Sequence, residues 1–137
     1  MRTSAISSGA YSTTAATEID VYEVSPRDGL QNEAAILTVD QKMEVIEKLA
    51  EARPATVEVC SYVREDRVPQ MAGAEELCQR INQSAWAKAA RDDGTQFSAL
   101  ILNKKGFERF MLNPLDTVTL VVSCTNGHSK VRLASPD

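Results

Sequence analysis

The densest polar segment of this 137-residue chain runs from Arg27 to Glu33, with the sequence Arg-Asp-Gly-Leu-Gln-Asn-Glu. The guanidinium of Arg27 can stabilise a developing oxyanion, and the carboxylate of Asp28 can bind a hard divalent cation such as Mg2+ or Mn2+. Gln31 adds a side-chain amide. An ordinary strand-to-helix loop explains the same residues, because Asp-Gly is a common turn pair. The residues alone therefore leave a reactive site and a plain loop both open.

A second candidate, Glu58, lies inside an apolar segment between Val57 and Val59. Strand alternation places its carboxylate on the face opposite the two valines. Glu58 then points either toward a polar site or toward covering helices, where it must be paired. Cys60 is expected on the same face as Glu58. Because no basic residue adjoins it in the sequence, Cys60 is expected to be a structural thiol rather than a nucleophile.

Four short segments rich in β-branched residues are predicted to be strands, separated by loops and helices. The expected strands are 19–24, 56–61, 97–102 and 117–123. A polar loop is expected over 27–37. The second helix is expected to carry Leu77, Ile81 and Ala85 on one face, and a third helix is expected over 104–112.

The first helix has the clearest start signal in the chain. Thr38 and Gln41 form a capping box, in which the Thr38 hydroxyl accepts an amide hydrogen bond while Gln41 reaches back. The apolar stripe that follows consists of Val39, Met43, Ile46 and Ala50. Lys42 lies outside this stripe, and Pro54 is expected to close the helix.

Strands that alternate with helices imply parallel pairing through right-handed crossovers, and therefore an α/β sheet. An open doubly wound sheet and an arc of a (β/α)8 barrel both fit this order. No GxGxxG or GxxxxGKS/T motif follows a strand, which weakens the nucleotide-binding versions. Charged residues come directly after strand ends, where barrels hold their catalytic groups. We therefore expect a partial (β/α)8 barrel of about four parallel strands with intervening helices.

Composition excludes several classes of protein. The chain is 43% hydrophobic and 25% charged, with a net charge of -4, so a general binder of nucleic acid is not expected. No apolar run approaches the roughly 20 residues that cross a bilayer, so no membrane partner is expected. Three cysteines without a CxxC pair indicate reduced thiols in the cytoplasm or, alternatively, the mitochondrial matrix. The one histidine, His128, cannot build a histidine-based metal site alone.

Composition also divides the chain into three parts. Residues 1–18 are rich in Ser, Thr and Ala, which is typical of a disordered leader or a weak transit peptide. Residues 19–130 hold the alternating strands and helices. Residues 131–137 are expected to form an irregular tail.

Four motifs, in this order along the chain, resemble those of the 3-hydroxy-3-methylglutaryl-CoA (HMG-CoA) lyases. The segment 23–33 resembles the signature after their first barrel strand, and 57–61 with Val68-Pro-Gln-Met71 resembles their second-strand glutamate and VPQM segment. The segment 103–108 resembles their PNLKGFE motif, and 123–130 resembles the serine-rich loop after their fourth strand. The resemblance covers the N-terminal half of such a barrel.

The resemblance implies a role for four residues. Asp28 matches a divalent-metal ligand, for Mg2+ or Mn2+, and Arg27 matches the catalytic arginine that polarises the substrate carbonyl and steadies the enolate of departing acetyl-CoA. Gln31 matches a substrate-lining position, and Glu58 matches a catalytic carboxylate near the substrate. The implied partner is an acyl-CoA. The implied reaction is metal-assisted retro-Claisen cleavage of 3-hydroxy-3-methylglutaryl-CoA, or a similar 3-hydroxyacyl-CoA, to acetyl-CoA and acetoacetate.

Departures from the family pattern limit this expectation. Ala34 stands where the family has a basic residue, and the sequence after Lys130 differs from the family's run. The family's H-x-H pair, asparagine ligand and cysteine loop belong to later strands and have no match here. The expectation is therefore an inactive or incomplete lyase fragment. The alternative is a non-catalytic half-barrel interaction protein or pseudoenzyme, with a homo-oligomer as a candidate assembly.

Overall fold

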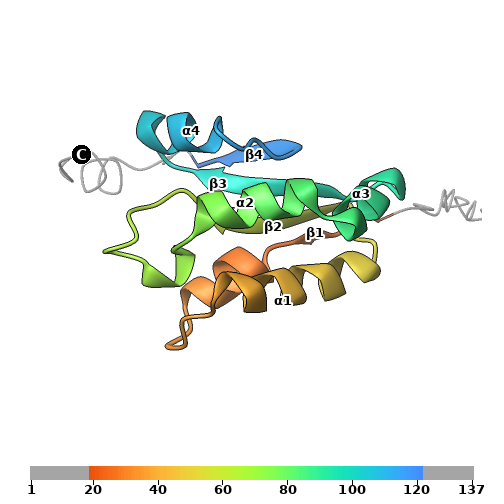
Figure 1. Ribbon diagram of the computed structural model, residues 1–137, viewed down its shortest axis with the longest axis horizontal. Helices are drawn as coiled ribbons and strands as arrows, with labels where there is room; N and C mark the ends of the chain where they lie inside the picture. The colour runs from red at the N-terminus through yellow and green to blue at the C-terminus, as the bar shows by residue number, and fades with distance from the viewer. Residues whose placement is uncertain (1–18, 122–137) are drawn as a thin grey trace, which may run out of the picture.

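Four parallel strands form one sheet in the order β1-β2-β3-β4 (Figure 1). The structure is a computed structural model that describes residues 19–121. The strands are β1 (Tyr22–Glu23), β2 (Thr56–Ser61), β3 (Gln96–Ile101) and β4 (Thr117–Leu120). The helices are α1 (Val39–Glu51), α2 (Ala74–Gln83), α3 (Ala85–Asp92) and α4 (Lys104–Phe110), with a π-helical turn η1 (Ser25–Gly29) and a 3-10 turn η2 (Pro69–Met71). The predicted alternation of parallel strands and helices is confirmed.

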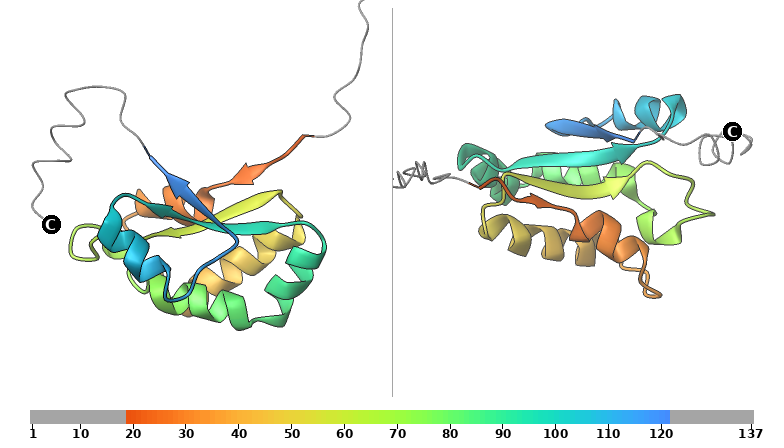
Figure 2. Two further views of the ribbon diagram at one scale, coloured as in Figure 1. Left: turned by 90° about the horizontal axis from the view of Figure 1, so that it is seen from above. Right: turned by 180° about the vertical axis from the view of Figure 1, so that it is seen from behind.

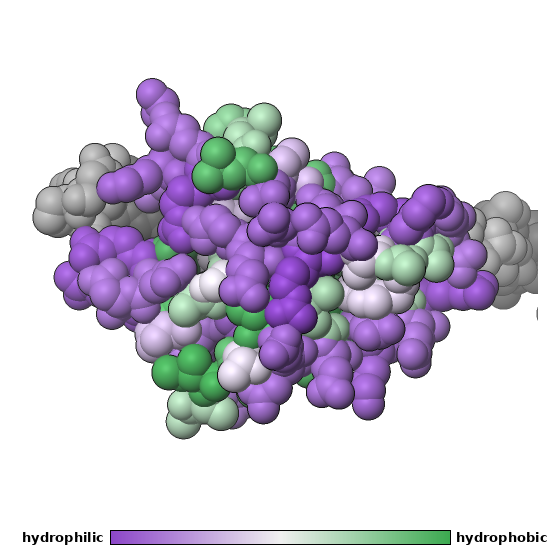
Figure 3. All heavy atoms as spheres, viewed as in Figure 1, coloured by the Kyte–Doolittle hydropathy of each residue, from purple (hydrophilic) through white to green (hydrophobic). Residues whose placement is uncertain are grey.

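The α-helices lie on one face of a curved sheet, and the views in Figure 2 show the opposite face without a covering α-helix from residues 19–121. The hydrophobic core fills the helix side. Val57, Phe97 and Ala99 of the sheet and Ile46 and Leu77 of the helices all belong to this buried cluster. The outer surface of the helices is mainly hydrophilic, with small separate apolar patches (Figure 3). Because the core fills the helix side, the polar side chains of the expected site must lie on the other face of the sheet.

The capping box at the start of α1 is confirmed on both sides. The Thr38 hydroxyl accepts from the Gln41 amide at 3.2 Å, and the Thr38 amide donates to Gln41 Oε1 at 2.9 Å. At the other end the helix stops at Glu51, before Pro54, because Arg53 adopts a left-handed conformation with φ 54°. No helix among residues 19–121 is long and apolar enough to cross a membrane.

Two other expectations about helices are wrong. Ala85 does not continue the helix of Leu77 and Ile81, because Ser84 is extended and begins α3 by accepting from the Ala87 amide at 3.4 Å. Serine favours such a position because its hydroxyl replaces a missing helical partner. Lys42 does not lie outside the buried stripe of α1 either: it is buried with Ile46 and Ala50, and its Nζ donates to the Ala72 carbonyl at 2.8 Å.

A β-bulge in β2 changes which side chains share a face. Glu58 pairs with Ser98, whereas Cys60 pairs with Ala99, so Val59 is the extra residue. One extra residue reverses the alternation beyond it. Cys60 therefore lies on the helix side in the core cluster, and the expectation that it shares a face with Glu58 is wrong. Its expected structural, buried character is consistent with this position.

Candidate active site

The first two polar residues of the predicted site, Arg27 and Asp28, lie in η1, which directly follows β1. The expected loop is here a π-helical turn: the amides of Arg27 and Asp28 both donate to the Val24 carbonyl, at 3.1 and 2.7 Å. Pro26 opens this turn and is buried. The turn packs against β2, which brings the Arg27 side chain to the face of the sheet that carries Glu58.

Arg27 bridges two carboxylates. Its Nε donates to Glu58 Oε1 at 2.5 Å, and an Nη donates to Asp28 Oδ1 at 2.7 Å. The Glu58 side chain is 1% exposed and that of Arg27 is 16% exposed, so water screens this pair weakly. Of the two alternatives for Glu58, the structure selects the side opposite the helices, toward the polar site.

The second oxygen of Glu58 is held by a residue that sequence reasoning missed. The Tyr22 hydroxyl donates to Glu58 Oε2 at 3.1 Å and lies 2.8 Å from Ser98 Oγ and 2.6 Å from Thr119 Oγ1. An ionised carboxylate accepts only, so the Tyr22 proton goes to Glu58, and the hydroxyls of Ser98 and Thr119 donate to Tyr22. The network takes one residue from each of the four strands. In the sequence, the alternation of polar and apolar residues within the strands could have indicated that these polar side chains share one face of the sheet.

Ser61 lies on this same face because of the bulge at Val59. Its side chain is 1% exposed, and its hydroxyl has no hydrogen-bond partner among residues 19–121. Buried hydroxyls are normally satisfied by protein or water. The face that carries Glu58 is thus polar along the length of β2.

Asp28 is much more exposed to solvent than Arg27 and Glu58. Its side chain is 56% exposed, and one of its oxygens accepts from Arg27. A carboxylate is a suitable donor for a hard divalent cation. Residues 19–121 contain no group of three or more histidine, cysteine, aspartate or glutamate side chains that could hold a metal ion. Asp28 therefore fits as one ligand, and further ligands would have to come from water or from groups outside this range.

The loops after β1 and β2 are tied together beside the site. Gln31, the predicted substrate-lining residue, is half-buried and lies two residues after the end of η1. Two residues on, the Glu33 carbonyl accepts from Gln70 Nε2 at 2.8 Å. Gln70 belongs to η2, so the two predicted motifs meet through this hydrogen bond. The structure brings Arg27, Asp28 and Glu58 into direct contact, but Gln31 is not part of their hydrogen-bond network.

Arg109, a residue of α4, also contacts the loop between β2 and α2. Arg109 donates to Glu75 Oε1 at 2.5 Å and to the Val63 carbonyl at 3.1 Å, and it lies 3.5 Å from Glu65. The hydrogen bond from Arg109 lowers the pKa of Glu75. Because Glu75 lies in the first turn of α2 and Val63 lies two residues after β2, one guanidinium contacts both ends of the loop.

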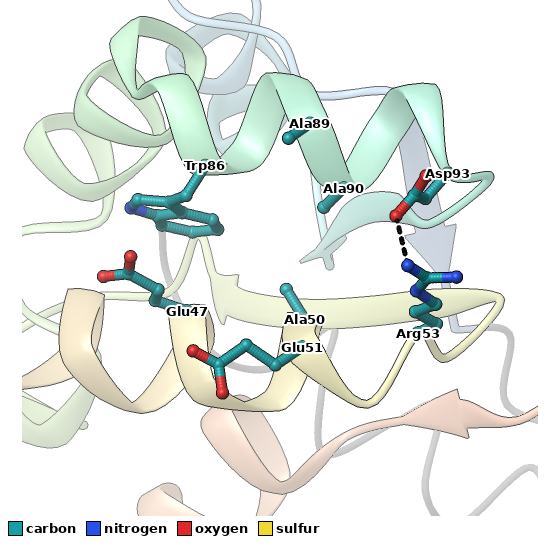
Figure 4. A pocket seen from close by; sticks show the side chains of 8 residues that line it. All are labelled: Glu47, Ala50, Glu51, Arg53, Trp86, Ala89, Ala90 and Asp93. Carbon is teal, nitrogen blue, oxygen red and sulfur yellow. Dashed lines mark ion pairs between the residues drawn. The ribbon is translucent and has the colours of Figure 1, made fainter.

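Two hollows of the described surface lie away from this network. One, of about 320 Å3, lies between α1 and α3, where Trp86 lies across from Glu47 at one end and the Arg53–Asp93 ion pair of 3.1 Å closes the other (Figure 4). Another, of about 450 Å3, is lined by Ile19 to Val21 and the segment around Pro54, at the amino ends of the strands. Neither contains Arg27 or Glu58 in its lining.

Several known proteins with a similar sequence or structure are CoA lyases. A model of the family described as HMGL-like matches residues 18–135. The (R)-citramalyl-CoA lyase of Chloroflexus aurantiacus is 35% identical over 111 residues, which are 80% of this chain and 35% of that protein. The chain spans about a third of the length of such curated relatives.

Two solved structures extend the comparison. Hydroxymethylglutaryl-CoA lyase from Pseudomonas aeruginosa matches with a TM-score of 0.71 and 32% identity, over 85% of this chain and 36% of that one. An HMG-CoA lyase from Acinetobacter baumannii, in complex with coenzyme A and 3-methylmalate, matches with a TM-score of 0.68 and 29% identity, over 80% of this chain and 33% of that one. The four strands are thus part of a (β/α)8 barrel, as expected.

Proposed function

Because the chain belongs to the HMGL-like family, we propose that residues 19–121 supply one wall of an acyl-CoA lyase site. The observation that carries this proposal is the bridge from Arg27 to Glu58 and Asp28 at the open face of the sheet. A fixed guanidinium held by a buried carboxylate and presented beside an exposed one suits a reaction in which negative charge develops on an oxygen. The proposed reaction is retro-Claisen cleavage of a 3-hydroxyacyl-CoA.

Arg27 is the proposed catalytic group. Its position between two carboxylates fixes the guanidinium without exposing it fully, so it can polarise a substrate carbonyl and stabilise the enolate oxygen of acetyl-CoA. Glu58 orients Arg27 through Oε1 and is itself oriented by Tyr22 through Oε2. A direct catalytic contact of Glu58 with substrate and a substrate contact of Gln31 remain predictions.

Asp28 is the proposed ligand for Mg2+ or Mn2+. Such an ion would supply concentrated positive charge to the oxygens of the substrate. The exposed carboxylate of Asp28 is oriented by Arg27, so the chain's contribution is to present one charged oxygen ligand next to the proposed oxyanion site. The remaining ligands are proposed to lie outside residues 19–121.

The proposed substrate class is a CoA thioester with a 3-hydroxy group. Relatives are named for citramalyl-CoA and hydroxymethylglutaryl-CoA, and one related structure holds coenzyme A. We favour 3-hydroxy-3-methylglutaryl-CoA, cleaved to acetyl-CoA and acetoacetate, with citramalyl-CoA as the competing substrate. The compartment, cytoplasmic or mitochondrial, stays a prediction.

A chimera tests this proposal. Residues 19–121 replace the matching segment of the P. aeruginosa lyase, and cleavage of hydroxymethylglutaryl-CoA and citramalyl-CoA is measured with Mg2+ or Mn2+. Turnover of either thioester above that of a chimera carrying Asp28→Asn supports the proposal. A folded chimera without turnover of either thioester contradicts it. The isolated chain is expected to show no turnover, because Asp28 is the one proposed metal ligand among its described residues.

One observation favours the alternative role as a half-barrel interaction protein. Among residues 19–121 the edge strands of the sheet are β1 and β4, and apolar residues are exposed beside both: Ile19 and Val21 before β1, and Leu120 and Val121 at the end of β4. Unpaired strand edges with apolar side chains favour association. A concentration-independent dimer in size-exclusion chromatography, with one cooperative melting transition, would support this role. A monomer at all concentrations would contradict it.

A further inference from the structure

Two cysteines that the proposed lyase chemistry does not use lie side by side in the core. The sulfur atoms of Cys60 in β2 and Cys78 in α2 are 3.7 Å apart, and the two residues are 2% and 0% exposed. The bulge at Val59 creates this contact, because without the extra residue Cys60 would point to the opposite face of the sheet. The contact thus depends on a specific feature of β2.

The two thiols are chemically unequal. The hydrogen bond with Cys60 lowers the pKa of Cys78, while the same bond, together with burial, raises the pKa of Cys60. Cys78 is therefore the first of the two to ionise. The thiolate is the reactive form of cysteine, so Cys78 is the expected nucleophile and Cys60 the resolving thiol.

We propose that Cys60 and Cys78 form an oxidation site, at which a peroxide converts the two thiols into a disulfide that joins β2 to α2. The sulfur of Cys78 attacks one peroxide oxygen, the O–O bond breaks, and a sulfenic acid and one water form. The sulfur of Cys60 then attacks the sulfenic sulfur, an S–S bond forms, and a second water leaves. With hydrogen peroxide, two thiols and one peroxide give one disulfide and two waters.

The disulfide would constrain the loop that lies next to the proposed site. The chain between the two cysteines contains the β2–α2 loop and Gln70, whose side chain contacts the loop after β1. Closing this segment restricts the unfolded chain, and a bond that fits the native contact stabilises the fold. Because both sulfurs are sealed from solvent, peroxide reaches them only when α2 separates locally from β2.

The test uses the full chain carrying Cys124→Ser, which removes the third cysteine and leaves Cys60 and Cys78 unchanged. The folded protein is treated with hydrogen peroxide, free thiols are alkylated after denaturation, and peptides are analysed without reductant. The expected product is a monomer in which the Cys60 and Cys78 peptides are linked, with a mass lower by two hydrogen atoms. It should form faster than the chain unfolds globally, and it should raise the thermal midpoint by about 5 °C.

Three results would overturn the proposal. In the first, both thiols are still alkylated after peroxide treatment. In the second, the linked product forms only at the rate of global unfolding. In the third, the linked product has a lower thermal midpoint than the reduced protein. Cys78→Ala in the same background is the matched control, and it should give no linked peptide and no peroxide-dependent rise in midpoint. If that variant does not fold, Cys78→Ser serves the same purpose. None of these readouts depends on lyase activity, so they also stand if the proposed function fails.

Discussion

Arg27 and Glu58 form the most deeply buried ion pair among residues 19–121, with Arg27 Nε 2.5 Å from Glu58 Oε1. The pair joins a turn after β1 to the middle of β2, so it connects two segments that are 31 residues apart in the chain. A carboxylate at this depth is tolerated because both of its oxygens accept hydrogen bonds. Consequently the same contact stabilises the fold and fixes the group proposed to act on substrate.

Replacing Glu58 with Gln should destabilise the chain. The amide removes the charge that Arg27 pairs with and places an N–H group among donors, so the free energy of unfolding should fall by about 2–4 kcal/mol. Urea unfolding followed by circular dichroism measures this. The matched control is Asp92→Asn, which breaks an exposed ion pair with Lys88 and should change stability by less than about 0.5 kcal/mol. Equal effects of the two substitutions would contradict the account.

Replacing Tyr22 with Phe tests the network that spans the four strands. The substitution leaves the ring but removes the hydroxyl shared by Glu58, Ser98 and Thr119, and the fully buried Ser98 loses this partner. We expect a loss of about 1–3 kcal/mol in unfolding free energy. Tyr62→Phe is the control, since the buried Tyr62 hydroxyl has only the weakly accepting sulfur of Cys78 beside it among residues 19–121, and its removal should cost less. The opposite order would show that the network does not stabilise the sheet.

Lys42 predicts a specific dependence of stability on pH. Burial lowers the pKa of Lys42 below its usual 10.5, with Cys60 and Glu65 opposing this shift. The unfolded chain therefore binds more protons than the folded chain between the lowered pKa and 10.5, and the contribution of Lys42 to stability rises as pH rises through that window. Lys42→Met should remove this rise, so its stability relative to wild type should be greatest below the window. A difference between the two proteins that does not vary with pH would contradict the prediction.

Asp28 should bind Mn2+ weakly in the isolated chain. Paramagnetic line broadening in NMR spectra should be strongest for the amides of η1, because Asp28 is exposed there and its carboxylate is the proposed ligand. Asp28→Asn should remove the broadening. Asp66→Asn, which changes an exposed aspartate paired with Arg64 in the neighbouring loop, should not. Broadening that follows Asp66 instead of Asp28 would place the cation elsewhere.

Local patterns predicted much of this fold. The capping box of Thr38 and Gln41 uses neighbours three residues apart, so the sequence contains all of the contact. Parallel pairing followed from the alternation of strands and helices, and the polar cluster after β1 pointed to Arg27 and Asp28. These features depend on short spacing or on general rules of connection.

The missed features depend on contacts between distant residues. The bulge at Val59 moved Cys60 onto the helix side, and strand alternation alone cannot indicate where an extra residue falls. Ser84 begins a new helix although Leu77, Ile81 and Ala85 follow a helical spacing, because its hydroxyl competes for a backbone amide. The sequence predicts Tyr22 only as a strand residue, because its three hydrogen-bond partners come from three other strands.

The measurement that tests the central claim most directly is the effect of Arg27→Lys on lyase turnover in the chimera. Lysine keeps the positive charge but cannot bridge Glu58 and Asp28 with one planar group. The account predicts that kcat falls by about 100- to 1000-fold while the chimera stays folded. Arg64→Lys, in the loop after β2, should leave turnover within about twofold of its unchanged value. Turnover that survives Arg27→Lys unchanged would contradict the claim that Arg27 is the catalytic cation of this site.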